Sequence, residues 1–263
     1  MKILSTLACV FLIFLSYIPL HAQTSLAYDT EKEPIAYGAT QLRNALVEKG
    51  SSLTTYHLDQ LAELPDIYVI TKEDIPETLS KYVSSSEIDD LSAEGYQRQW
   101  INNGKSLLIL ASDAVGAEYA LLELAEIVQV TGDYREVPDK TVQPAMEYRI
   151  VKFNLPWSPY RTSEAMSVHL QTCRDLAFWE RFLDMMAENR LNVLSLWNKH
   201  PFPYMIQATN FPKATPFNEQ EMDEWQVFWK ALFRMASAMF GAEDLGYIWA
   251  SFDTNIGLYC HIV

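Results

Sequence analysis

The chain has 263 residues and 49% of them are hydrophobic, so it can bury a sizeable core, and its composition argues against global disorder. The formal net charge of −14 argues against a nucleic-acid partner and against an anionic membrane surface, because the sequence has no basic stripe that could bind phosphates. Aromatic residues make up 13% of the chain and are concentrated after about Tyr148, which fits either a sugar-binding surface or a well-filled core.

The N-terminal segment has the pattern of a secretory signal peptide. Lys2 precedes an apolar stretch over about residues 3–20, and the small residue Ala22 follows it. We expect residues 1–22 to be cleaved, which predicts a secreted or periplasmic protein. A retained membrane anchor is the alternative, because the apolar stretch approaches the length that spans a bilayer.

Residues 23–143 alternate strand and helix patterns, which predicts an N-terminal α/β sandwich domain. We expect strands at 24–30, 53–58, 66–71, 94–101 and 105–112, and helices at 33–50 and 114–128. The sequence Asn-Asn-Gly at 102–104 predicts a β-hairpin between the last two strands. Ser112 or Asp113 could cap the second helix.

A polar segment at 132–149 separates this part from the rest of the chain. It contains Pro138 and Pro144, as connections between domains often do. We place the domain boundary between residues 143 and 144.

Residues 144–263 show a second run of strand and helix patterns, which predicts the start of a parallel (β/α)8 barrel of the TIM type. The expected elements are a strand at 147–156, a loop at 157–166, a helix at 174–190, a strand at 191–197, a loop at 198–217, a helix at 219–240 and a strand at 245–252. Asn218 and Glu221 predict a capping box at the start of the last helix. Because a closed barrel needs about 250 residues by itself, we expect an incomplete, truncated barrel. A small open α/β domain is the alternative.

Two segments at expected strand ends carry side chains suited to binding a sugar. Trp rings can stack on a sugar ring, while Asn, His and Arg side chains can hydrogen-bond hydroxyls or a carboxylate. We predict substrate-binding residues from both segments: Trp157 and Arg161 after the first strand, and Trp197, Asn198 and His200 at the end of the second. Each has a structural alternative: Trp197 would close the top of the barrel, and Arg161 would pair with a surface acid.

Arg149 is a further predicted substrate-binding residue. It lies early in the first expected strand of the second domain, where its side chain would face the barrel interior. A buried arginine needs a partner, which leaves two alternatives, an internal acid or a bound substrate.

The sequence indicates no catalytic residue directly. Glycoside hydrolysis usually needs two carboxylates, but most acids of the second domain lie on faces of expected helices and should be solvated. Asp253, just past the last expected strand, is the one acid in a plausible site position.

Motifs for other chemistries are missing from the sequence. It has no glycine-rich phosphate loop, no G-x-S-x-G and no H-E-x-x-H, and His57, His169 and His200 have no metal-ligand spacing. Outside the expected signal peptide only Cys173 and Cys260 remain, which support neither a disulfide framework nor a zinc site. We expect no cofactor and no metal.

Two segments resemble known carbohydrate-active enzymes. Residues 94–126 (EGYQRQWINNGKSLLILASDAVGAEYALLELAE) are similar to the non-catalytic N-terminal domain of β-hexosaminidases and α-glucuronidases, in which a hairpin precedes a helix that begins near a Gly-x-x-Tyr-like segment, here Gly116 to Tyr119. Residues 181–202 (RFLDMMAENRLNVLSLWNKHPF) resemble the start of the barrel that follows it, where a helix ends in D-x-M-A-x-x-x-x-N. That pattern is matched by Asp184, Met186, Ala187 and Asn192.

The resemblance covers nearly all of the chain from residue 23 to about Met239 and implies a secreted glycoside hydrolase that acts on terminal sugars of polysaccharides. The sequence WNKHPFPY stands where hexosaminidases carry H-x-x-D, which moves the expectation toward α-glucuronidase-like relatives. In these families the catalytic acids lie on later strands, so the resemblance implies an inactive fragment with its carboxylates beyond the C-terminus. The alternatives are a non-catalytic carbohydrate-binding protein and a structural module without a ligand.

Overall fold

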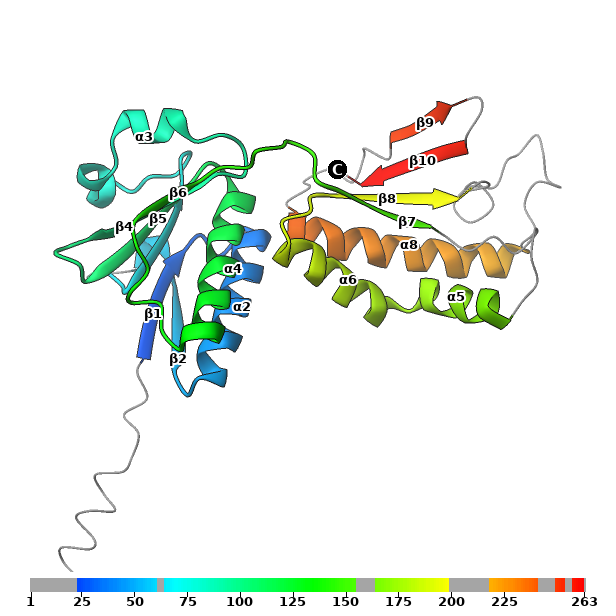
Figure 1. The fold of residues 1–263 in the computed structure, drawn as a ribbon, viewed down its shortest axis with the longest axis horizontal. Helices are drawn as coiled ribbons and strands as arrows, with labels where there is room; N and C mark the ends of the chain where they lie inside the picture. Colours follow the sequence, from blue (N-terminus) through cyan, green and yellow to red (C-terminus); the bar gives the residue numbers. More distant parts are fainter. Residues whose placement is uncertain are drawn as a thin grey trace, which may run out of the picture.

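The computed structural model describes residues 23–60, 64–154, 164–198, 218–240, 249–253 and 257–262. Within these ranges the chain forms two β-sheets, each with long helices against one face (Figure 1). The expected signal peptide, residues 1–22, lies outside the described residues, so its cleavage stays a prediction. None of the helices in the described ranges is long and apolar enough to cross a bilayer.

The first sheet has six strands in the order β2-β1-β3-β5-β4-β6. They are β1 (Gln23–Tyr28), β2 (Ser52–His57), β3 (Ile67–Thr71), β4 (Tyr96–Ile101), β5 (Ser106–Ala111) and β6 (Lys140–Val142). β1, β2, β3 and β5 are parallel, while β4 is antiparallel to β5 and β6. The predicted hairpin is confirmed. Its turn residues Asn102, Asn103 and Gly104 all have positive φ, a conformation that these residue types tolerate.

Helices α2 (Glu33–Glu48) and α4 (Ala114–Thr131) lie side by side on one face of this sheet (Figure 1). A second apolar cluster, around Tyr68, Ile70 and Leu110, covers the other face. It includes residues from η1 (Leu58–Gln60) and η2 (Glu77–Tyr82), and the short helix α3 (Ser85–Asp90) follows them. Because both faces are covered, β3 and β5 are buried along their whole length, and they are mostly apolar, as buried parallel strands usually are.

Asp113 is the residue that caps α4. Its carboxylate accepts hydrogen bonds from the backbone N–H of Gly116 at 2.8 Å and of Glu94 at 2.7 Å. We predict that Asp113→Ala lowers the free energy of unfolding by about 1–2 kcal/mol in urea titrations, because the capping bond is lost. Asp113→Asn, which keeps one acceptor oxygen, should lose less. An alanine variant as stable as the unmodified protein would contradict this assignment.

The second sheet has four strands in the order β7-β8-β10-β9. They are β7 (Ile150–Asn154), β8 (Val193–Asn198), β9 (Trp249–Asp253) and β10 (Gly257–Ile262). β7 and β8 are parallel, as predicted. The expectation that the strand at 245–252 continues the parallel series beside β8 is wrong, because β10 pairs with β8 in the antiparallel sense and separates it from β9. Three residues join β9 to β10, and such a short connection favours antiparallel pairing over a long crossover.

Three helices cover one face of this sheet (Figure 1): α5 (Glu164–Arg174), α6 (Leu176–Glu188) and α8 (Glu219–Phe240). The predicted helices at 174–190 and 219–240 are confirmed, but α5 was expected to be partly loop. The predicted capping box is present, since Asn218 and Glu221 exchange two hydrogen bonds of 2.9 Å. Cys173, at the end of α5, is fully buried, and burial raises the pKa of its thiol to about 12.

Candidate functional site

The carboxyl ends of β7 and β8 form the edge at which we expected the sugar site. The parallel register sets Lys152 opposite Ser195 and Asn154 opposite Trp197. The carboxyl ends of these two parallel strands therefore lie side by side, which is where α/β folds build ligand sites. Trp197 and Asn198 end β8 at this edge.

The other predicted loop residues cannot be placed at this edge. Trp157, Arg161 and His200 lie outside the described residues, as do the side chains of Trp197 and Asn198. A substrate contact from any of these five residues stays a prediction. Asp253 ends β9 and pairs with Gly257 of β10. The next residue of β10, Leu258, pairs with Asn198, so the backbone of Asp253 lies at the same sheet edge as Asn198.

Lys152 and Ser195 are two residues at this sheet that sequence reasoning missed. Val151 and Phe153 pack with the helix-side core, so alternation turns Lys152 toward the face without helices. Leu194 also belongs to the helix-side core, so Ser195, which is 4% exposed, faces the same way as Lys152. The alternating pattern of residues 150–154 would have been sufficient to indicate Lys152.

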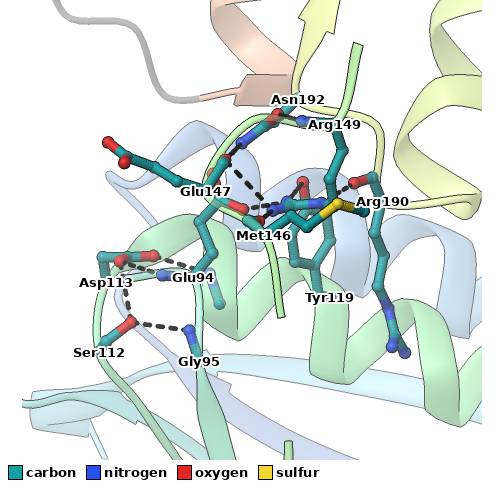
Figure 2. A network of polar contacts seen from close by, with 11 residues as sticks. Glu94, Gly95, Ser112, Asp113, Tyr119, Met146, Glu147, Arg149, Arg190 and Asn192 are labelled. Atoms are coloured by element: carbon teal, nitrogen blue, oxygen red, sulfur yellow. Dashed lines mark hydrogen bonds and ion pairs between the residues drawn. The ribbon is translucent and has the colours of Figure 1, made fainter. Parts of the chain in front are cut away.

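Arg149 lies at the opposite end of β7, where it takes part in a group of polar contacts between the two sheets (Figure 2). Its Nη1 group donates to the carbonyl oxygens of Met146 at 2.8 Å and Glu147 at 3.4 Å. The Nε group donates to the carbonyl of Arg190, and Nη2 donates to the carboxylate of Glu94 and to the Tyr119 hydroxyl. An arginine has five N–H groups, and these contacts provide an acceptor for each of them.

Of the two alternatives for Arg149, the structure shows the internal acid, Glu94. A contact with substrate would require Arg149 to exchange one of these bonds. Burial opposes the charge of Arg149, but the bond to Glu94 outweighs burial and raises the pKa of the guanidinium above its ordinary value. Sequence reasoning missed Glu94, which precedes β4 by two residues.

The contacts around Arg149 continue into the turn before β8. The Asn192 side chain donates to Glu94 at 2.8 Å and accepts from the Arg149 backbone N–H at 2.8 Å. Glu94 and Arg190 have positive φ values of 59° and 57°, which non-glycine residues adopt rarely. We call Glu94, Tyr119, Arg149, Arg190 and Asn192 the junction network, because it joins the first sheet and α4 to the start of β7 and the turn before β8.

A small pocket of about 280 Å³ opens between α2, α4 and α6. It is lined by Gln41, Leu122, Glu123, Ala125, Glu126, Gln129, Glu188, Asn189 and Arg190. Glu123 is already paired, at 2.7 Å with both Arg98 and Lys140. Burial raises the pKa of Glu123, but hydrogen bonds from Lys140 and Tyr96 outweigh burial and lower it. Within the described ranges no three His, Cys, Asp or Glu side chains gather where they could hold a metal ion.

Comparison with known proteins identifies similar folds. No protein-family model and no curated protein match the chain. The solved structure of a GH138 enzyme targeting pectin rhamnogalacturonan II aligns with a TM-score of 0.64 and 21% identity over 83% of this chain and 30% of that one. The β-N-acetylhexosaminidase from Bacteroides fragilis NCTC 9343 aligns at a TM-score of 0.46 and 14% identity over 84% of this chain and 40% of that one. The structure of CpGH84D aligns at a TM-score of 0.46 and 9% identity over 85% of this chain and 40% of that one.

The first of these alignments shows the fold that the chain has. It is a mixed α/β fold like that of the matching part of a glycoside hydrolase, and the chain spans 30% of the length of that enzyme. The predicted likeness to glycoside hydrolases is therefore confirmed at the level of the fold.

Proposed function

We propose that this chain is a secreted relative of the glycoside hydrolases that act on terminal sugars of polysaccharides, of the α-glucuronidase-like or hexosaminidase-like type. In this proposal residues 23–143 form a non-catalytic α/β domain, and the parallel strands β7 and β8 within residues 144–263 are the first two strands of a (β/α)8 barrel. The observation that carries the proposal is the parallel pairing of β7 with β8, which sets Asn154 opposite Trp197 at one sheet edge. The fold shared with the GH138 enzyme supports it.

The residue types at this edge suit a sugar. Trp197 and Trp157 would stack on the apolar face of a sugar ring, while Asn198 and His200 would hydrogen-bond its hydroxyls. Arg161 would bind a carboxylate with two parallel hydrogen bonds. The GH138 neighbour targets pectin rhamnogalacturonan II, so oligosaccharides of this pectin are the first ligands to test.

Hydrolysis needs two carboxylates on either side of the bond that is cleaved, roughly 5–9.5 Å apart. Among the described residues of the second sheet, Asp253 is the one acid whose backbone the register sets at the same edge as Asn198. This observation favours the alternative function, a non-catalytic carbohydrate-binding protein. We therefore expect the 263-residue chain to bind sugar without releasing reducing ends.

Isothermal titration calorimetry tests this proposal directly. Oligosaccharides of rhamnogalacturonan II, xylan and chitin should be titrated into the folded chain, and one class should bind saturably. Trp197→Ala should weaken that binding about tenfold through loss of stacking, whereas Trp100→Ala, a matched change in β4, should not. The absence of binding to every carbohydrate would contradict the proposal. A reducing-sugar assay on the same samples separates hydrolysis from binding alone.

A further inference from the structure

Glu118 is a buried carboxyl group that no function discussed above uses. It lies on α4, its side chain is 0% exposed, and neither of its carboxyl oxygens has a hydrogen-bond partner among the described residues. A charged carboxylate without a partner is very unfavourable in such a place, so the group must be neutral while it stays buried.

Side chains near Glu118 contribute to the contact between two units of the molecule. The first unit is the first sheet with α2 and α4, and the second unit is the second sheet with α5, α6 and α8. Tyr37 of α2 interacts electrostatically with Glu118, and its hydroxyl donates to Asp184 of α6 at 2.7 Å. Tyr119, the next residue along α4, bonds to Arg149 of the junction network. Two bonds that join the units, Tyr37 to Asp184 and Tyr119 to Arg149, are therefore made by neighbours of Glu118.

Helices α2 and α4 also lie close together beside Glu118. A Cβ atom at Gly38 would lie 3.1 Å from the Glu118 carbonyl oxygen and 3.2 Å from its Cα atom. There is accordingly little space for water between these two helices of the first unit. Solvation of the Glu118 carboxylate would require the surrounding contacts to open.

We propose that Glu118 makes the contact between the two units sensitive to pH, so that they stay docked while its carboxyl group is protonated and separate more readily when it ionises. Burial raises the pKa of Glu118 well above its ordinary value, and the negative charge of Glu94 raises it further. The ionisable groups around this region are Tyr37 and Tyr119, whose pKa burial raises, the acids Glu94, Asp184 and Glu188, and Arg149. The guanidinium of Arg149 is already bound to Glu94, so its charge is balanced there rather than at Glu118.

The direction of the pH effect follows from the coupling between proton binding by Glu118 and docking of the two units. Below the ordinary glutamate pKa, Glu118 is protonated in both the docked and the separated states, and docking is strongest. As the pH rises above that value, the separated state loses its proton and the docked state keeps it. The docking constant then falls by up to about tenfold per pH unit, until the pH passes the raised pKa that Glu118 has in the docked state.

Small-angle X-ray scattering of the full chain between pH 5 and pH 9 tests this proposal. The radius of gyration of the unmodified chain should rise with pH, whereas Glu118→Gln and Glu118→Met should stay compact. Glu126→Gln removes the same charge from an exposed position on the same helix and should behave like the unmodified chain.

Two results would overturn the proposal. One is an unmodified chain whose radius of gyration does not change with pH, and this result needs no variant at all. The other is a rise with pH that persists in either Glu118 variant. Far-UV circular dichroism at each pH confirms that the chains compared are folded. If the buried amide of Glu118→Gln prevents folding, Glu118→Met is the variant that decides.

Discussion

Replacement of Trp179 by alanine should lower the free energy of unfolding by about 3–5 kcal/mol, the largest effect we expect from a single substitution. The Trp179 side chain is 0% exposed, and its ring centroid lies 4.8 Å from that of Phe153 on β7. Its indole Nε1 group donates to the carbonyl oxygen of Cys173 at 2.9 Å. Alanine would leave a cavity between the second sheet and its helices and would also leave a buried carbonyl without a partner.

Urea titration followed by circular dichroism and by tryptophan fluorescence measures this loss. Val227→Ala on α8 is the control, because Val227 is 68% exposed and its truncation should change stability by less than about 0.5 kcal/mol. A Trp179→Ala variant within about 1 kcal/mol of the unmodified protein would show that this packing does not hold the second unit together.

Replacement of Arg149 by alanine should lower the free energy of unfolding by about 2–3 kcal/mol, because charge-assisted hydrogen bonds to a partly buried carboxylate are lost. The side chains of Arg149 and Glu94 are only 13% and 21% exposed, so water replaces the lost contacts poorly. The remaining Glu94 carboxylate would keep one bond, from Asn192 at 2.8 Å.

A double-mutant cycle with Glu94→Ala separates the pair from its surroundings. We expect a coupling energy of at least about 1 kcal/mol, since the two side chains are in direct contact. Arg135→Ala is the matched control, because its ion pair with Asp133 is exposed at 47% and 49% and should contribute little. Additive effects of Arg149→Ala and Glu94→Ala would contradict the assignment of a stabilising pair.

Much of the fold is predictable from local sequence patterns. The helix α8 has both a capping box at Asn218 and an apolar stripe, so its bounds match the prediction. The hairpin of β4 and β5 follows from Asn-Asn-Gly at its turn. In each case a short stretch of sequence carries both the periodicity and the end signal.

The features that were missed depend on contacts between distant residues. The pairing of β10 with β8 joins residues that lie far apart in the sequence, so no local pattern predicts it. Helix α5 is polar on average, and Val168 within it is 61% exposed. The partner of Arg149 is Glu94, 55 positions away. Glu118 is a missed residue that local sequence could have indicated. It lies in a helix with few polar residues, and burial of such a helix on most of its faces is the usual outcome.

Chemical-shift mapping by NMR tests most directly whether the carboxyl edge of β7 and β8 binds carbohydrate. An oligosaccharide that binds in calorimetry should be added to the isotope-labelled chain, and the amide resonances should be followed. We predict that the largest changes fall on Asn154, Trp197 and Asn198, which the strand register brings to one edge. Changes confined to the pocket around Gln41 and Glu126, or no changes at any amide, would contradict this account.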